Sequence, residues 1–199
     1  NYVVECRIVD DVTTLSVHLA DVASSLADER DATVMRASGL LPDDAVAEAR
    51  RSVDDAAERF GRERVDATFP ARPELEGRID AIAQRLDRLS AVRGRADAGS
   101  VTVTGLFEAY DPLVQTIVDH VTDVGEIPRR ADVSRRALAF GRLLASNAAL
   151  ARQRVLVASA LTGAGVTDRP LRDGYAAGSR ALVYRDAFLQ LADPAQARH

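Results

Sequence analysis

The stretch VDDVTTLSVHLADVASSLADERDATVMRASGLLP, residues 9–42, decides the fold class of this chain. Its apolar residues recur at intervals of three and four, which places them on one face of an α-helix. The members of this stripe are Val9, Val12, Leu15, Leu19, Val22 and Leu26. The pattern predicts a long helix from about Val4 to Ser38, with Gly39 as its end and Pro42 just before the next helix.

The same spacing predicts five further helices along the chain. They cover about 43–61, 74–92, 104–125, 129 or 132 to 162, and 168–192. We expect irregular connections at 64–73 and 94–99. Ser100–Thr104 alternates as a short strand would, and we interpret it as the lead-in to a helix with Thr104 as N-cap. The chain is therefore expected to be one domain, 1–199, an all-α antiparallel bundle of about six helices in which the first and fifth are long.

Composition and motifs exclude several classes of function. The net charge of -4 gives no basic field for nucleic acid, and all 26 basic residues are Arg, which is typical of a GC-rich, actinobacterium-like genome. Cys6 is the single cysteine, and the three histidines are isolated, so no metal site is expected. Without lysine there is no P-loop, and no nucleophile elbow occurs. We expect no cofactor and no enzymatic activity from this chain.

Charged residues on otherwise apolar helix faces are the feature of the sequence that points to a candidate functional site. In the fifth predicted helix, Asn147 and Arg154 fall on the stripe expected to face the interior, and in the first helix the stripe reaches Glu29 or Arg30. Two readings remain open, because a buried charge needs a partner. One is an internal ion pair from Glu29 to Arg154 or Arg152. The other is a site for a small planar anion, to which guanidinium groups make paired hydrogen bonds; its arginines would be Arg30, Arg154, Arg152 and Arg36.

Several segments resemble one family. Residues 23–33, ASSLADERDAT, are similar to the Leu-x-x-Glu-Arg-Asp/Gly segment near the start of nitrate- and nitrite-sensing (NIT) domains. Residues 49–54 and 150–156 resemble later parts of the same domain, and Tyr110 and Ile117 fit its middle helix. The family's proposed nitrate contacts are arginines on the first helix and a later long helix, which here correspond best to Arg30 and Arg154.

The resemblance implies a biological context. In actinobacteria such domains are typically the extracytoplasmic part of a membrane sensor histidine kinase, which implies a homodimeric receptor, a roadblock-type protein and a small GTPase on the cytoplasmic side. In enterobacteria a related domain controls an RNA-binding antitermination module. The chain itself has no apolar run of the roughly 20 residues that a membrane helix needs. Because it opens at Asn1 within a helical pattern, we expect an excised fragment whose flanking membrane segments were left out.

The first hypothesis is thus an extracytoplasmic sensor of a small anion such as nitrate or nitrite. The alternative is a helical protein–protein interaction or dimerisation module without a small-molecule ligand, and a soluble cytosolic regulator is a third option.

Overall fold

Every regular element is an α-helix in the parts of the chain that the computed structural model describes, residues 2–66, 73–125, 131–162 and 168–192. The helices are α1 (Tyr2–Ala37), α2 (Asp43–Asp66), α3 (Pro73–Leu86), α4 (Leu89–Asp97), α5 (Val103–Gly125), α6 (Ala131–Thr162) and α7 (Asp168–Leu191). The predicted all-α bundle is confirmed, and its two long helices are α1 and α6.

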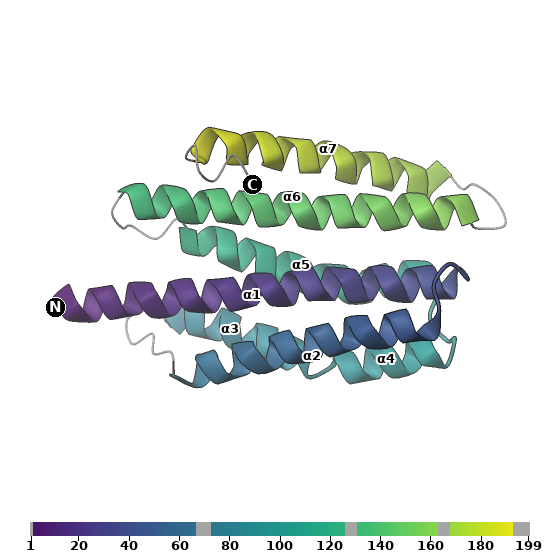
Figure 1. Ribbon diagram of the computed structural model, residues 1–199, viewed down its shortest axis with the longest axis horizontal. Helices are drawn as coiled ribbons and strands as arrows, with labels where there is room; N and C mark the ends of the chain where they lie inside the picture. Colours follow the sequence, from purple (N-terminus) through teal and green to yellow (C-terminus); the bar gives the residue numbers. More distant parts are fainter. Residues whose placement is uncertain (1, 67–72, 126–130, 163–167, 193–199) are drawn as a thin grey trace.

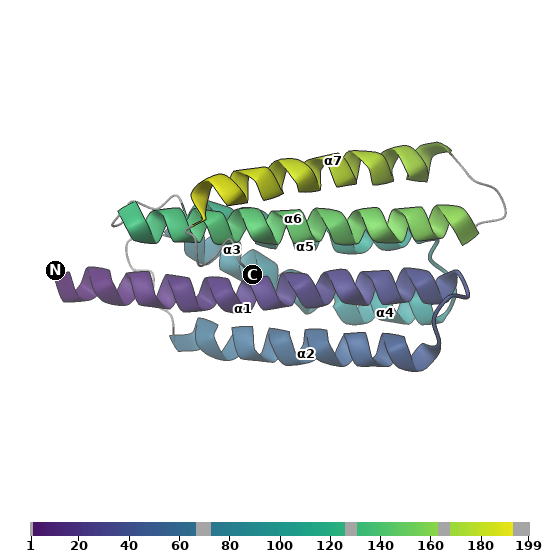
Figure 2. The ribbon, with the colours of Figure 1, turned by 45° about the horizontal axis from the view of Figure 1, so that its top comes forward.

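Helix α1 lies in the middle of the bundle. It contacts α2 on one side and both α5 and α6 on the other, and α7 packs on α6. Figures 1 and 2 show this order from two directions, with α7 and α6 above α1 and with α2 below it. Helices α3 and α4 follow one another along the lower side of the molecule (Figure 1). Side chains that leave α1 in different directions therefore meet different helices.

The turn between α1 and α2 follows from Gly39. Its φ of 72° lies in the left-handed region, which glycine adopts without a Cβ clash. The N–H of Leu40 donates to the carbonyl of Met35 and the N–H of Gly39 donates to that of Arg36, both at 2.8 Å. This pair of hydrogen bonds is a Schellman motif, which satisfies the last carbonyls of a helix. The predicted end of the first helix is confirmed.

The segment predicted as one helix over 74–92 is two helices, α3 and α4, separated at Asp87 and Arg88. Leu89 at the start of α4 is buried, and Arg93 of the same helix binds Glu29 of α1. The polar loop predicted at 94–99 is wrong for residues 94–97, because α4 continues to Asp97.

Two further boundaries differ from the predictions. Helix α2 continues past Gly61 to Asp66, so the irregular connection begins later than expected, and residues 67–72 lie outside the described residues. Helix α5 begins at Val103, and the hydroxyl of Thr102 accepts a hydrogen bond from the N–H of Gly105 at 3.1 Å. Thr102 therefore caps this helix, where Thr104 was predicted.

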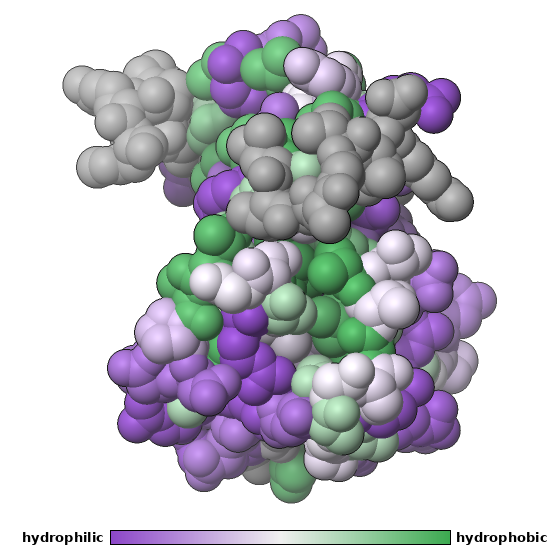
Figure 3. All heavy atoms as spheres, turned by 90° about the vertical axis from the view of Figure 1, so that its right-hand side faces the viewer, coloured by the Kyte–Doolittle hydropathy of each residue, from purple (hydrophilic) through white to green (hydrophobic). Residues whose placement is uncertain are grey.

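The core lies where α1, α5 and α6 meet. Its fully buried side chains include Leu19, Val22, Leu26, Leu106, Tyr110, Ile117 and Val155. Helix α6 approaches α5 closely at Gly141, where a Cβ atom would lie 3.1 Å from the Cα of Thr122. Seen from one end of the bundle, hydrophobic residues gather in the middle of the molecule and hydrophilic residues cover much of the lower part (Figure 3). No helix in the described ranges is both long and apolar enough to cross a membrane.

His120 of α5 is a buried histidine whose pKa is lowered to about 4, first by burial and then by the positive charge of Arg78, against a smaller opposing effect of Asp123. The unfolded chain takes up a proton on this side chain near pH 6.5, whereas the folded chain does so only near pH 4. Protonation therefore favours the unfolded state across this window.

We predict that lowering the pH from 7 to 4 reduces the free energy of unfolding of the wild type by up to about 3 kcal/mol more than it reduces that of the His120→Gln variant. Urea unfolding followed by circular dichroism at several pH values measures the difference. Parallel curves for the two proteins would contradict it.

Candidate functional site

Three consecutive charged residues of α1 are buried. Glu29, Arg30 and Asp31 are 0%, 1% and 5% exposed. Successive residues of a helix point about 100° apart, so these side chains leave α1 in three directions. A buried ion costs several kcal/mol unless it is paired and hydrogen-bonded. The partners of these three residues therefore define the polar centre of the molecule.

Glu29 is held by a group that we call the Glu29 cluster: Glu29, Arg50, Arg93 and Tyr110. The Nε and Nη2 atoms of Arg93 donate to the two carboxylate oxygens of Glu29, each at 2.8 Å. Tyr110 donates its hydroxyl to Glu29 Oε1 at 2.8 Å, and Arg50 Nε lies 3.9 Å from the same oxygen. Burial raises the pKa of the Tyr110 hydroxyl and the negative charge of Glu29 raises it further. The phenol therefore stays protonated as a donor.

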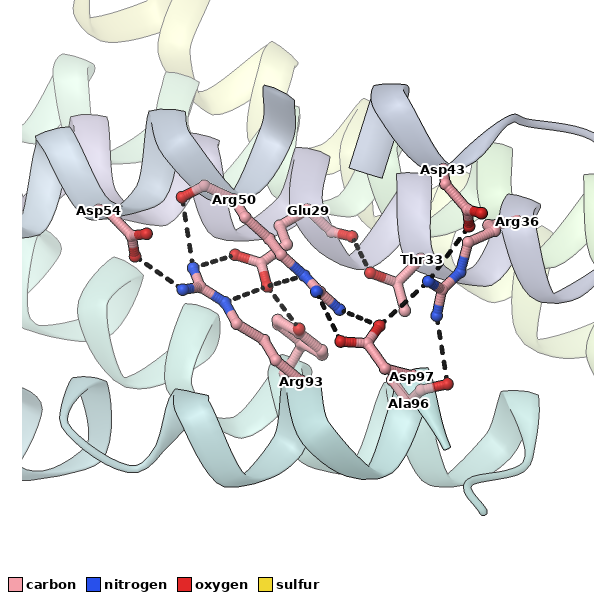
Figure 4. Close-up of polar contacts among 10 residues, drawn as sticks. Glu29, Thr33, Arg36, Asp43, Arg50, Asp54, Arg93, Ala96 and Asp97 are labelled. Carbon is pink, nitrogen blue, oxygen red and sulfur yellow. Dashed lines mark hydrogen bonds and ion pairs between the residues drawn. The ribbon is translucent and has the colours of Figure 1, made fainter. Parts of the chain in front are cut away.

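The Glu29 cluster continues to the surface between α2 and α4, as Figure 4 shows. Arg93 Nη1 donates to Asp54 at 2.7 Å, and Arg50 binds both oxygens of Asp97 at 2.9 and 2.8 Å. Arg36 also donates to Asp97, at 3.0 Å. These hydrogen bonds, first that of Arg50, lower the pKa of Asp97 to about 2. The network ties the short helix α4 to α1 and α2.

Arg30 belongs to a second group, the Arg30 cluster: Arg30, Asp31, Asp111, Arg152 and Arg154. Arg30 donates from Nε and Nη2 to Asp31 Oδ1 at 3.0 and 2.7 Å, and from Nη1 to Asp111 Oδ1 at 2.5 Å. Arg152 Nη1 donates to the other oxygen of Asp111, and Arg154 Nη2 donates to Asp31 Oδ2 at 3.0 Å. Burial raises the pKa of Asp31, and the charge of Arg30 opposes this rise. Three guanidinium groups thus share two carboxylates.

The ring of Phe107 supports two members of the Arg30 cluster. The guanidinium carbons of Arg30 and Arg152 lie 5.5 and 5.8 Å from the centre of this ring. At such distances a cation is attracted by the negative face of an aromatic ring. Phe107 lies one helical turn before Asp111 on α5, so the same helix provides both the ring and the carboxylate that hold the two arginines.

A pocket of about 260 Å³ opens beside Arg30 and Arg152. Its charged lining consists of Arg30, Arg152, Arg180 and Asp111, and its other walls come from α5, α6 and Tyr184 of α7. The Nε of Arg152 is buried and has no hydrogen-bond partner among the described residues. Since a water molecule occupies about 30 Å³ in the liquid, the pocket has room for a small anion together with several waters.

The structure separates the four arginines that the sequence nominated. Arg30 and Arg152 share this pocket, whereas Arg36 lies in the network between α2 and α4. The expectation that Arg154 and Asn147 face the interior is wrong. Asn147 is exposed. The Arg154 side chain is 59% exposed and lines a neighbouring groove of about 270 Å³, and it belongs to the Arg30 cluster only through its hydrogen bond to Asp31.

The predicted pairing of Glu29 with Arg154 or Arg152 is also wrong, because Glu29 pairs with Arg93 of α4. Sequence reasoning missed Arg93, Asp111 and Arg180. Asp111 carried one usable signal: it is a charged residue directly after Tyr110, on a helix whose stripe is otherwise apolar. Arg93 carried a similar signal, since it follows Leu86 and Leu89 at helical spacing on an apolar stripe, whereas Arg180 carried none.

Comparison with known proteins identifies the family. The family model described as nitrate and nitrite sensing (NIT) matches residues 21–199. The chain belongs to this family. The solved structure of the NasR transcription antiterminator is similar to the NIT domain described here, with a TM-score of 0.87 and 19% identity. That match covers 98% of this chain and 54% of the other, so this chain spans about half of the NasR chain, and the likeness shows the fold.

A curated relative matches only locally. A segment of 48 residues is 48% identical to the alpha subunit of phenylalanine–tRNA ligase from Rhodospirillum centenum. The match covers 23% of this chain and 13% of the ligase subunit, which is too little to indicate a shared activity.

We predict that Glu29→Gln lowers the free energy of unfolding by about 3 kcal/mol, because breaking a buried ion pair leaves an uncompensated charge. Thermal and urea unfolding measure the effect. Glu48→Gln is the matched control, since Glu48 forms an exposed pair with Arg51, and pairs of that kind contribute little. Equal stability of the two variants would show that Glu29 does not hold the bundle together.

Proposed function

We propose that this NIT domain binds nitrate or nitrite in the pocket beside Arg30 and Arg152. The supporting observation is that guanidinium groups from α1 and α6, those of Arg30 and Arg152, converge on one pocket. The positive charges outnumber the negative ones in the lining, with Arg30, Arg152 and Arg180 against Asp111. A planar oxyanion accepts paired N–H bonds from such groups.

The affinity of the site is limited by the size of the ligand. Nitrate has four heavy atoms, and a ceiling of about -1.5 kcal/mol per atom limits its binding free energy to about -6 kcal/mol. This corresponds to a dissociation constant of tens of micromolar or weaker. Binding is therefore rapidly reversible, as a sensor of changing concentration requires.

The context that we propose for this sensor is the extracytoplasmic part of a sensor histidine kinase. It is supported by the resemblance to actinobacterial receptors, in which a roadblock-type protein and a small GTPase act on the cytoplasmic side. A bound anion would shift the balance between two arrangements of α1 and α6 by its affinity difference for them. The full reading frame tests this context: a downstream ATP-binding kinase region supports it, whereas an RNA-binding module like that of an antiterminator refutes it.

We predict that Arg152→Ala weakens nitrate binding about 10- to 100-fold, which is the usual contribution of hydrogen bonds from a charged group. Isothermal titration calorimetry with sodium nitrate and nitrite, and with sodium chloride as the salt control, measures the loss. Arg135→Ala, at an exposed position of α6 outside the pocket, is the matched control and should bind as the wild type does. No heat with the wild type at millimolar nitrate or nitrite would refute the proposed ligand.

Self-association is a second candidate function, and the supporting observation is the pattern of exposed residues on the outer face of α7. Tyr175 and Val183 are 73% and 66% exposed on this face, and Ser179 lies midway between them. Arg172 precedes Ser179 by seven residues, and Asp186 follows it by seven. Two α7 helices that cross antiparallel at Ser179 would therefore place Tyr175 against Val183 and Arg172 against Asp186 of the second copy. Such self-complementarity is a property of a two-fold interface.

We predict that the chain dimerises weakly through this face, because small interfaces are weak, and that the dimer becomes detectable as the concentration is raised to about 1 mM. Sedimentation equilibrium should show that Arg172→Glu and Asp186→Arg are each more monomeric than the wild type. Mixing the two variants should restore dimers, because opposite charges then meet at both ends of the crossing. Asp173→Arg, on the flank of the same helix, is the control. A monomeric wild type, or no recovery on mixing, would refute this arrangement.

A further inference from the structure

Asp111 occupies the place between two guanidinium groups that an anion would need. One of its oxygens accepts from Arg30 Nη1 at 2.5 Å, and the other accepts from Arg152 Nη1. A carboxylate and a nitrate ion are both planar groups whose oxygens diverge from one central atom, so both fit the same pair of donors. The pocket that opens at this point includes Asp111 in its lining.

We propose that Asp111 is an internal competitor for the anion, and that the ligand binds by displacing this carboxylate from Arg30 and Arg152. The proposal rests on the proposed nitrate- or nitrite-binding function and concerns the regulation of the same site. In the ligand-free chain the carboxylate neutralises the two guanidinium groups. In the liganded chain the anion takes over that role, and Asp111 turns toward the open side of the pocket.

Both arginines have contacts that do not depend on Asp111. Arg30 remains bound to Asp31 through Nε and Nη2, and the Phe107 ring lies beside both guanidinium groups. Displacement frees one N–H of Arg30 and one of Arg152. These two donors, one from each arginine, can bind two oxygens of a planar anion as they bind the two oxygens of the carboxylate. The site therefore stays formed when the carboxylate leaves.

Helix α5 is suited to such a displacement. Pro112 follows Asp111 inside the helix and has no N–H to donate to the preceding turn, so the helix can bend there at low cost. Tyr110, on the other side of Asp111, donates to Glu29, which binds Arg93 of α4. A shift of α5 at Asp111 is thus transmitted through Tyr110 to the Glu29 cluster.

The test compares nitrate binding by the wild type, Asp111→Asn and Asp119→Asn in calorimetry. Asp119 lies on the same helix, is exposed and is not part of the pocket lining, so its variant changes the net charge equally. The amide oxygen of the variant still accepts the hydrogen bond that Asp119 accepts from the lining residue Gln115. We expect Asp111→Asn to bind nitrate at least about 10-fold more tightly than the wild type, because a charged competitor has been removed. Asp119→Asn should bind as the wild type does.

Each outcome decides a different point. Detectable wild-type binding together with tighter binding by Asp111→Asn supports the competition, whereas no wild-type binding overturns it together with the proposed ligand. Wild-type binding with equal or weaker binding by Asp111→Asn overturns the competition and leaves the anion site standing.

A second measurement covers the case in which Asp111→Asn folds poorly. Asp111→Ala leaves room where the carboxylate was, so sodium nitrate or sodium formate should raise its melting temperature more than sodium chloride does, and more than it raises that of the wild type. Equal shifts with all three salts would overturn the competition. A crystal structure of the wild type with nitrate bound in the pocket and Asp111 still bridging Arg30 and Arg152 would overturn it as well.

Discussion

The burial of Glu29, Arg30 and Asp31 on α1 is the constraint on which the rest of the structure depends. Apolar packing alone would allow the surrounding helices many rotations and offsets, because hydrophobic contact is not directional. Three buried ions remove that freedom, since each must meet a hydrogen-bonding partner within about 3 Å. The partners come from three helices. Helix α4 provides Arg93, α5 provides Tyr110 and Asp111, and α6 provides Arg152 and Arg154.

The two clusters are neighbours on both of the helices that they share. Glu29 and Arg30 are adjacent on α1, and their partners Tyr110 and Asp111 are adjacent on α5. The pocket on one side and the network that reaches α2 and α4 on the other are therefore joined by two adjacent pairs of residues. A sensing domain needs such a connection, because ligand binding must alter contacts away from the ligand.

The sequence predicted the helices better than the partners of the charged residues. Spacing by three and four residues identified the long helices, and it correctly marked Glu29 and Arg30 as charges on a buried face. The same counting failed for Arg154, which lies three heptads beyond Val133. A straight helix drifts by about 20° per heptad against a seven-residue repeat, so Arg154 points away from the face of Val133 and toward solvent. Glu29 and Arg93 are 64 residues apart in the sequence. Their pairing depends on the relative rotation and offset of α1 and α4, which no local pattern encodes.

Arginine rather than lysine throughout the chain has a consequence for both clusters. A guanidinium group has five N–H donors in a fixed plane, whereas an ammonium group has three on a single nitrogen. Arg93 uses this capacity to join Glu29, Asp54 and the carbonyl of Arg50 at once. Guanidinium groups also keep their charge up to very alkaline pH. The positive charges of the polar centre are therefore insensitive to alkali and to reagents that modify amines. Acid changes the charge of this centre only by protonating its carboxylates.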